Sequence, residues 1–278
     1  MLKVALNGAS GLVGSRIVEL LQNNFQFIDL PQSQMDITNS EQVNQVVSKT
    51  DFDIFLHLAA YTNVDAAEIN QRLAYKINVE GTRNIFQAVT QKNKKFIYIS
   101  TGFVFDGENP PYDESSQPHP LSTYAKTKWQ GEEVVRSRSM IVRIEYPYRA
   151  KYDLKKDLLQ TIRSLIGNNK TVYAVTDSII TPTFIDDIAF GLKYLLENHS
   201  PEIFHLVGAD SLSPYDACKT IADVFNLNKN LIQPTTSEIY FKGKAIRPKN
   251  AIIKSIKNHF YKMKTFKQGL TEIIKQLQ

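Results

Sequence analysis

The stretch LSTYAKTKWQGEE, residues 121–133, places Tyr124 and Lys128 four residues apart. On a helix, side chains at positions i and i+4 share one face, so the phenol and the ammonium would be neighbours. A nearby ammonium favours the phenolate and lowers the pKa of a tyrosine from its usual value of about 10. A tyrosine tuned in this way can give a proton to a carbonyl oxygen. The pair therefore predicts a site where Tyr124 is the proton donor and Lys128 lowers its pKa.

The spacing alone does not single out this pair, because the chain contains thirteen tyrosines. The same Tyr-x-x-x-Lys pattern occurs at Tyr152/Lys156, Tyr215/Lys219 and Tyr240/Lys244. Only Tyr124 lies on a predicted helix that follows a strand ending in hydroxyl side chains. That strand lies in YISTGFVFDG, residues 98–107, where Ser100 and Thr101 present hydroxyls at the strand end. These hydroxyls either bind a ligand in the crevice beyond the strand ends or cap the strand exit.

A glycine-rich stretch, GASGLVG at residues 8–14, follows the first predicted strand directly and opens a helix. Gly8 permits the tight turn, Gly11 lets the backbone approach a pyrophosphate, and Gly14 allows close packing of helix on strand. The N–H groups at the helix N-terminus then face the phosphates, together with the positive end of the helix dipole. This context predicts a dinucleotide cofactor, either NADPH or NADH.

Asp29 lies 21 residues after Gly8, at the end of the second predicted strand. It either accepts hydrogen bonds from an adenosine ribose or is a turn residue before the loop PQSQ. In the first case NAD would be preferred, because a carboxylate repels the 2′-phosphate of NADP. Ala59, Ala60 and Tyr61 follow another buried strand, where small residues let a cofactor lie against the backbone. His57, within that strand, is expected to face the core.

The elements that would position these residues alternate between apolar runs and helical patterns. Strands are predicted at 3–8, 25–30, 52–59, 95–100 and 140–144, with helices at about 12–23, 39–49, 65–92 (broken near Asn78) and 122–137. Continuous apolar runs suit strands that are buried on both faces, so we predict a doubly wound parallel sheet of the Rossmann type. Residues 1–145 would form this dinucleotide-binding domain. Residues 146–278 would form a smaller mixed α/β substrate lobe whose chain interleaves with the first domain.

The composition is that of a soluble globular protein, with 42% apolar and 22% charged residues in 278. No apolar run approaches the roughly 20 residues that span a bilayer, and no signal peptide precedes the first strand. Cys218 is the single cysteine, so we expect a reducing cytoplasm. The net charge of +5 includes a stretch, residues 239–271, with nine Lys or Arg and no acid. No nucleic-acid module accompanies this charge, so neither a nucleic acid nor a membrane is expected as a partner.

Several segments together resemble the dTDP-4-dehydrorhamnose reductase family, within the extended short-chain dehydrogenase/reductase superfamily. They are GASGLVG, MDIT, LHLAAYTNVDAAE, NVEGTRN, YISTGFVFDG, YAKTKWQGE, TPTFIDDIA, IFHLVG and RPKN, in order from residue 8 to 250. The resemblance implies reduction of the C4 ketone of a nucleotide-linked 4-keto-6-deoxyhexose by a reduced nicotinamide. It implies that Tyr124 supplies the proton, Thr101 binds the carbonyl oxygen and Lys128 also holds the nicotinamide ribose. Arg247 would bind the nucleotide or its diphosphate, or else be a surface arginine.

The resemblance also extends the set of cofactor contacts. Asp36 in the MDIT segment would contact the adenine. Asn78 would interrupt a helix and brace the site, unless it is simply a helix N-cap. The cofactor-binding residues expected in total are Gly8, Ser10, Gly11, Leu12, Val13, Asp29, Asp36, Ile37, Ala59, Ala60, Tyr61, Asn78, Ser100, Tyr124 and Lys128.

The chain departs from the family pattern on the sugar side. The family usually reads Ser-Thr-Asp where this chain has Ser100-Thr101-Gly102, so a polar contact near the sugar is expected to be missing. A tryptophan is replaced by Tyr146, and a glutamine by Ser178. The substrate contacts expected are Thr101, Gly102, Tyr146 and Arg247.

These departures keep two alternatives open. One is an epimerase or dehydratase acting on another sugar nucleotide, although dehydratases usually carry an Asp-Glu pair where this chain has Gly102-Phe103. The other is a non-catalytic, dinucleotide-binding regulatory subunit similar to that of methionine adenosyltransferase. The sequence is compatible with a homodimer, and no spacing of side chains predicts a metal site.

Overall fold

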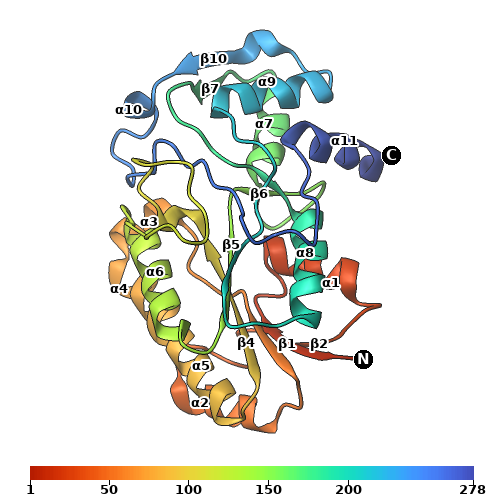
Figure 1. The fold of residues 1–278 in the computed structure, drawn as a ribbon. Coiled ribbons are helices and arrows are strands. Elements are labelled where there is room, and N and C mark those ends of the chain that lie inside the picture. Colours follow the sequence, from red (N-terminus) through yellow and green to blue (C-terminus); the bar gives the residue numbers. More distant parts are fainter.

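The computed structural model describes residues 1–278 and contains a central sheet of six strands (Figure 1). The strands are β1 (Lys3–Asn7), β2 (Gln26–Asp29), β3 (Ile54–His57), β4 (Lys95–Thr101), β5 (Met140–Ile144) and β9 (Ile203–His205). They lie in the order β2-β1-β3-β4-β5-β9, and every neighbouring pair is parallel. The predicted doubly wound parallel sheet is confirmed, and its internal strands β3 and β5 are buried along their whole length.

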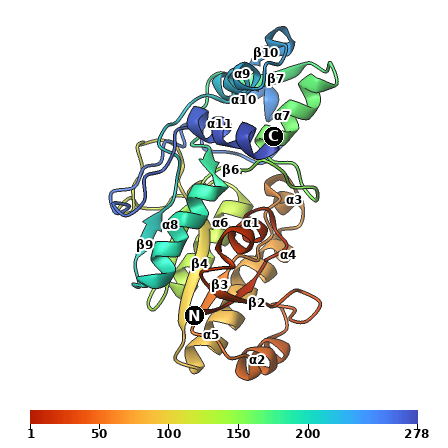
Figure 2. The ribbon, with the colours of Figure 1, turned by 90° about the vertical axis from the view of Figure 1, so that its right-hand side faces the viewer.

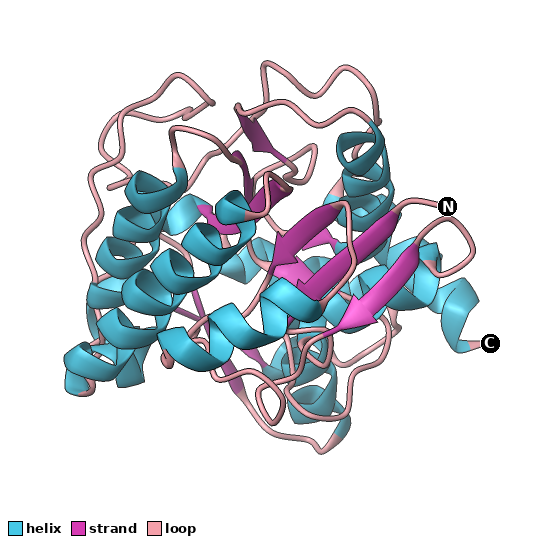
Figure 3. Ribbon diagram, turned by 90° about the horizontal axis from the view of Figure 1, so that it is seen from below, coloured by secondary structure: helices cyan, strands magenta, loops and turns pink.

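Helices cover both faces of this sheet, as the view from below shows (Figure 3). The helices α1 (Leu12–Leu21) and α8 (Ile185–Glu197) pack on one face around a core that includes Val4, Ile97 and Val142. The helices α2 (Ser40–Lys49), α5 (Thr82–Gln91) and α6 (Thr123–Val135) lie on the other face. Residues on successive strand positions face opposite cores because side chains alternate along a strand.

The helical region expected at 65–92 is divided into four pieces. They are α3 (Val64–Ile69), α4 (Gln71–Tyr75), a π-helical turn η1 (Lys76–Gly81) and α5. The predicted break near Asn78 falls in the π-helical turn. π-Turns inside helices are frequent at functional sites.

The second lobe lies above the sheet in Figure 1 and has a core of its own. Its elements are β6 (Pro147–Tyr148), α7 (Leu158–Gly167), β7 (Val172–Val175), β8 (Thr183–Phe184), α9 (Pro214–Val224), η3 (Lys229–Leu231), β10 (Ile232–Thr235), α10 (Ser237–Tyr240) and α11 (Phe266–Leu277). The sequence did not predict α11. Its start is nevertheless encoded locally, because Thr265 and Gln268 form a capping box.

The chain passes between the two parts more than once (Figure 2). After β6 and α7 it returns through α8 and β9, and β9 joins the edge of the main sheet beside β5. The stretch 250–256 then pairs with the loop that precedes α6, where Tyr112 N donates to Ile252 O at 2.8 Å. No helix in the structure is long and apolar enough to span a bilayer.

Candidate active site

The sheet reverses its strand order beside β1, whose neighbours are β2 and β3. The loops that follow β1 and β3 diverge there, and ligands of open α/β sheets bind at such a point. Gly8 has a φ of +74°, and a Cβ built on it would lie 2.9 Å from Ala59 N. A Cβ on Gly14 would lie 2.3 Å from Gly8 O. Glycine at position 8 therefore lets the loop after β1 approach the loop after β3, and glycine at position 14 lets the first turn of α1 pack against the turn at Gly8.

The start of α1 fits a pyrophosphate. Gly11 is the N-cap and has no side chain to cap the helix. The first N–H groups of a helix, here those of Leu12 and Val13, have no partner within the helix and carry its positive dipole end. An anion at this position would be held by backbone N–H groups. The glycine-rich turn and the uncapped helix therefore suit the dinucleotide that the sequence predicts.

A segment after β6 crosses the glycine-rich loop and was not expected from the sequence. The Tyr152 hydroxyl donates to Ser10 O at 2.6 Å, and Arg149 Nη1 donates to Ser15 Oγ at 2.9 Å. Lys155 Nζ lies 3.4 Å from Thr62 Oγ1 in the loop after β3. Tyr152 belongs to the Tyr152/Lys156 match, which the sequence analysis did not select as the proton-donor pair. No pattern in the neighbouring sequence predicted that it would contact a loop 142 residues earlier.

Asp29 ends β2, and Asp36 lies in the segment between β2 and α2. Asp29 is exposed at the carboxyl end of β2, where it is aligned with Leu6 of β1. Asp36 Oδ1 accepts hydrogen bonds from the backbone and side chain of Thr38, both at 2.9 Å. Ile37 packs close to Gly81, where a Cβ would lie 2.7 Å from Ile37 Cγ1. Residues 17–48 contain no lysine or arginine, so β2 has no positive side chain and α2 has one only at its last residue, Lys49.

Asn78 braces the site and is not a helix N-cap. Its Oδ1 accepts from Tyr61 N at 2.8 Å, and its Nδ2 donates to Tyr61 O at 3.2 Å. The same Nδ2 donates to Thr127 Oγ1 on α6 at 3.0 Å. One buried amide therefore joins the loop 59–61 to the helix that carries Tyr124, which agrees with the bracing expectation.

His57 faces the core, as the sequence suggested. Its ring nitrogens lie 2.9 Å from Asn7 Oδ1 and 3.0 Å from Thr82 Oγ1. Burial lowers the pKa of His57 to about 3. A histidine that stays neutral inside a hydrogen-bonded strand supports the loop after β3 and does not act on a substrate.

Tyr124 and Lys128 are both buried on α6, whose start is capped by Ser122 Oγ. Lys128 Nζ donates to Ile99 O at 2.8 Å and lies 4.0 Å from the ring centroid of Tyr98. Burial lowers the pKa of Lys128 to about 7. Burial raises the pKa of Tyr124 to about 12, and the neighbouring Thr101 hydroxyl offsets part of this rise. Burial therefore outweighs the lowering of the Tyr124 pKa that was expected from Lys128, whose ammonium is directed to a backbone carbonyl.

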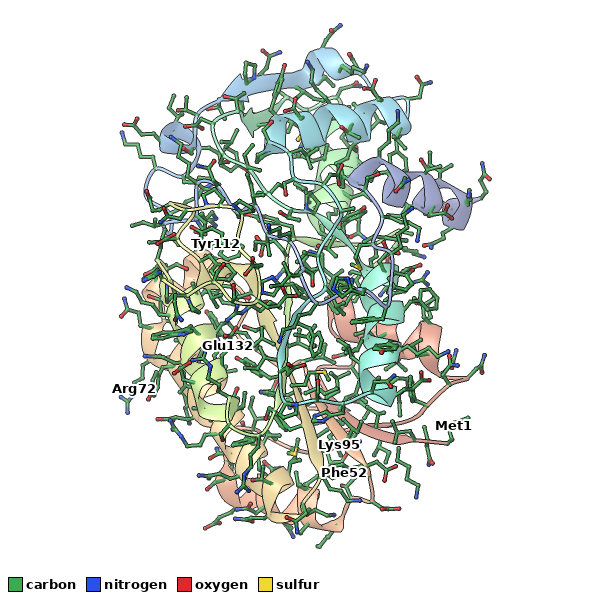
Figure 4. The ribbon with its side chains drawn as sticks, viewed as in Figure 1. Met1, Phe52, Arg72, Lys95, Tyr112 and Glu132 are labelled. Atoms are coloured by element: carbon green, nitrogen blue, oxygen red, sulfur yellow. The ribbon has the colours of Figure 1, made fainter.

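A buried ion pair supports α6 against the sheet. Arg143 on β5 donates to both oxygens of Glu132, at 2.9 and 2.6 Å, and each side chain is 1% exposed. The third nitrogen of Arg143, Nη1, lies 3.4 Å from His205 Nε2 on β9. Glu132 is labelled in Figure 4, between α6 and the sheet. A bidentate pair of this kind fixes the position of α6, and therefore of Tyr124, relative to β5.

The sugar side contains a carboxyl group that the sequence did not predict. Glu145 follows β5 and is buried, and its Oε2 lies 2.4 Å from the position that a Cβ on Gly102 would take. Position 102 itself has no polar side chain, as expected, and Glu145 brings a carboxyl group into the adjoining space from the neighbouring strand. Burial raises the pKa of Glu145 to about 8. Only the three-dimensional pairing of β4 with β5 reveals this exchange.

Tyr146 extends the same wall with aromatic rings. Its φ of +36° lies in the left-handed region, which is strained for a tyrosine. Its ring centroid is 5.6 Å from that of Phe103, which lies 5.8 Å from the ring of Tyr124. Ser100 and Ser178 are both buried, and Ser100 Oγ has no hydrogen-bond partner.

Arg247 approaches this wall from the second lobe. Its Nη2 donates to Asp65 Oδ1 on α3 at 2.9 Å, so the arginine spans the two lobes. Burial raises the pKa of Tyr146, and the charge of Arg247 lowers it in part. Four cations of the basic stretch 239–271 have acidic partners, and these are Arg247, Lys249, Lys257 and Lys264. No group of three His, Cys, Asp or Glu side chains is close enough to hold a metal ion.

Comparison with known families shows which family this chain belongs to. The family model described as RmlD substrate binding domain matches residues 2–278. The chain belongs to this family. Among curated relatives, the chain is similar to the dTDP-4-dehydrorhamnose reductase of Aggregatibacter actinomycetemcomitans. It is 30% identical over 80% of this chain and 79% of its own. The probable low-salt glycan biosynthesis reductase of Haloferax volcanii is 30% identical over 82% of each chain.

One relative has a different name. Methionine adenosyltransferase 2 subunit beta of Bos taurus is 29% identical over 90% of this chain and 79% of its own. Among solved structures, the dTDP-4-dehydrorhamnose reductase of Bacillus anthracis, in complex with NADP, superposes with a TM-score of 0.93. It is 31% identical and covers 99% of this chain and 100% of its own. Dehydratase and epimerase structures of 17–18% identity share the fold alone.

Proposed function

We propose that this member of the RmlD substrate binding domain family is an NAD(P)H-dependent reductase of a nucleotide-linked 4-keto-6-deoxy sugar. The observation that carries the proposal is that Thr101 ends β4 beside Tyr124, which lies buried with Lys128 on the following helix α6. The relatives named dTDP-4-dehydrorhamnose reductase support this substrate class. The chain is accordingly an oxidoreductase with a nicotinamide cofactor.

The residues that would hold this cofactor lie along the strand ends. The backbone of Gly8, Gly11 and the first turn of α1 would bind the pyrophosphate. The carboxylate of Asp29 would accept hydrogen bonds from the hydroxyls of the adenosine ribose. Lys128 would hold the nicotinamide ribose, and Ser100 Oγ, buried and without a partner, is available to a ligand. Asp36 and Ile37 would lie toward the adenine. When bound, a reduced nicotinamide supplies the hydride that a carbonyl carbon accepts.

The proton chemistry follows from the surroundings of Tyr124. Its pKa of about 12 keeps the phenol protonated at neutral pH, which is the state that a proton donor requires. Thr101 lies beside it, so one carbonyl oxygen could accept hydrogen bonds from both hydroxyls. As negative charge develops on that oxygen, Tyr124 releases its proton to it. Arg247 would contact the nucleotide or its diphosphate, since it reaches across the two lobes.

Turnover of a defined substrate tests this proposal. Purified protein is expected to oxidise NADH or NADPH when dTDP-4-dehydrorhamnose is added, as followed by absorbance of the reduced nicotinamide. Binding of the cofactor without turnover of dTDP-4-dehydrorhamnose or any other 4-keto-6-deoxy sugar nucleotide would contradict it.

A second candidate function rests on the similarity to methionine adenosyltransferase 2 subunit beta. In that case the chain would bind a dinucleotide and serve another enzyme without reducing a sugar. The altered sugar side, with Gly102 and Tyr146, is compatible with this role. The same assay separates the two, because a regulatory subunit would bind cofactor and show no turnover. An epimerase or dehydratase would instead convert a sugar nucleotide without net consumption of reduced nicotinamide.

A further inference from the structure

Glu145 is a buried acid whose carboxyl group has no partner. The residue is 1% exposed at the end of β5, and neither of its carboxyl oxygens makes a hydrogen bond. The Gly102 N–H faces the carboxyl and slightly favours its charged form, without meeting it in a hydrogen bond of ordinary geometry. Buried polar groups are nearly always paired, so an unpaired one requires an explanation.

The position of this carboxyl depends on Gly102. A Cβ on Gly102 would lie 2.4 Å from Glu145 Oε2 and 2.0 Å from Ile253 Cδ1. The φ of Gly102 is not positive, so its backbone conformation would accept another residue. A side chain at position 102 is instead excluded by the neighbouring atoms of Glu145 and Ile253. Glu145 and Gly102 therefore form one unit, in which an acid from β5 fills the volume left open at the end of β4.

The charged and titratable groups around Glu145 are few. The charge of Glu145 acts on Tyr124 of α6 and on Tyr146, which follows it in the chain. The stretch 251–255 contributes the apolar Ile253. The nearest cations on these elements are engaged elsewhere, since Arg143 pairs with Glu132 and Lys128 donates to Ile99 O. With no cation to stabilise a carboxylate, burial keeps the acid protonated at neutral pH.

The charge state of Glu145 acts on the candidate proton donor. A carboxylate at this position is one of the causes that raise the pKa of Tyr124, after burial, because like charges oppose each other most strongly where water is excluded. In the proposed reduction the phenol O–H bond breaks, its proton goes to the carbonyl oxygen, and a negative charge is left on the phenolate. A neutral acid beside the phenolate tolerates that charge, whereas a carboxylate opposes it.

We propose that Glu145 is a positioning residue for Tyr124, a carboxylic acid held neutral in the space beside Thr101 so that no negative charge opposes proton release. This inference rests on the proposed reductase function. The matched comparison is Glu133→Gln, which makes the same chemical change at an exposed position of α6.

Infrared difference spectra test the protonation state without substrate. Wild-type protein minus Glu145→Gln is expected to show the carbonyl stretch of a protonated carboxylic acid at pH 7, lost with a midpoint near pH 8. Wild type minus Glu133→Gln should show no such band. Absence of the band at pH 7 in the first difference spectrum would overturn the inference, whether or not the protein reduces a sugar.

The pH profile of turnover tests the effect on Tyr124. Wild-type kcat is expected to fall about tenfold between pH 7 and pH 9, because about nine tenths of Glu145 would be ionised at the upper limit. Glu133→Gln should follow the wild-type profile, while Glu145→Gln should lose this decline. A decline that persists unchanged in Glu145→Gln would contradict the inference. A protein that shows the infrared band but reduces no sugar nucleotide would instead contradict the proposed function.

A relocated acid provides a second variant. Gly102→Asp combined with Glu145→Ala and Ile253→Ala, which removes the side chain 2.0 Å from the new Cβ, places the carboxyl in the same space from the other strand. This triple variant is expected to regain the decline between pH 7 and pH 9 relative to Glu145→Ala/Ile253→Ala, whereas a flat profile would count against a role for the carboxyl itself.

Discussion

Around Gly8 the site is lined by backbone and glycine, whereas around Gly102 it is lined by side chains from distant segments. On the first side, two strand ends approach until a Cβ on Gly8 would lie 2.9 Å from Ala59 N. On the second, Glu145 from β5 and Ile253 from the C-terminal stretch meet at Gly102. The backbone-lined half presents the same N–H groups whatever its neighbours are. The side-chain-lined half can change its chemistry by exchanging residues between strands, as Gly102 and Glu145 illustrate.

This contrast separates the cofactor contacts, which members of a family share, from the sugar contacts, which differ between members. A cofactor is common to many reactions, so backbone contacts to it impose glycine and small residues at defined positions. A sugar is recognised by side chains, and a residue lost from one strand can be replaced from the next. We therefore expect substitutions in the two halves to affect different binding constants.

Tyr124→Phe should have the largest effect, because it removes the proposed proton donor. General acid catalysis typically contributes about 10²–10⁴-fold to a rate, so kcat should fall by this factor. Dissociation constants for cofactor and sugar nucleotide should change little. Tyr215→Phe is the matched control, since it alters another Tyr-x-x-x-Lys pair in the second lobe. Retention of more than a tenth of the wild-type kcat in Tyr124→Phe would exclude it as the donor.

Gly14→Ala should selectively damage the backbone-lined half. The added Cβ would lie 2.3 Å from Gly8 O, so the loop must shift. Overpacking of this kind typically costs about 1–3 kcal/mol, and fluorescence titration should show cofactor affinity reduced by roughly 5- to 150-fold if the cost falls on the loop. Gly167→Ala is the control, because no atom lies within 4 Å of its added Cβ. Unchanged cofactor affinity in Gly14→Ala would show that the loop is more adaptable than its packing implies.

Arg247→Ala should affect the other half. It removes the guanidinium that joins Asp65 on α3 to the second lobe. We expect KM for the sugar nucleotide to rise about tenfold, because one charge-assisted contact worth about 1.4 kcal/mol would be lost. The affinity for the cofactor should not change. Lys262→Ala, which removes an exposed cation of the same basic stretch, should leave both constants as they are. Equal losses for the two variants would mean that general charge, not Arg247 itself, attracts the nucleotide.

The sequence predicted the backbone-lined half more completely than the other. Gly8, Gly11 and Gly14 act through local geometry, so a seven-residue motif contains most of the information about their role. The bracing role of Asn78 could also be inferred, because its motif interrupts a helix. The parallel sheet followed from continuous apolar runs, which are typical of strands buried on both faces.

Contacts between distant residues explain what sequence reasoning missed. Tyr152 reaches Ser10 across 142 positions, and no local pattern marks that contact. Glu145 fills the space at Gly102 only because β4 and β5 are neighbours in a specified register. The pKa of Tyr124 was expected to be lowered because spacing reveals the nearby ammonium but not the extent of burial, which outweighs it.

Cofactor choice tests the one part of the backbone-lined half that depends on a side chain. Asp29 is exposed at the end of β2, and no lysine or arginine occurs between residues 17 and 48 to neutralise a 2′-phosphate. We expect NADH to be used with a higher kcat/KM than NADPH, although the Bacillus anthracis relative is in complex with NADP. Asp29→Asn should reduce this preference by roughly tenfold or less, since a solvated charge pair is worth about 1 kcal/mol. Glu41→Gln, an exposed acid on the neighbouring α2, should leave the preference intact. A wild-type protein that uses NADPH as well as NADH would show that Asp29 points away from the ribose, and that this half too is determined by backbone alone.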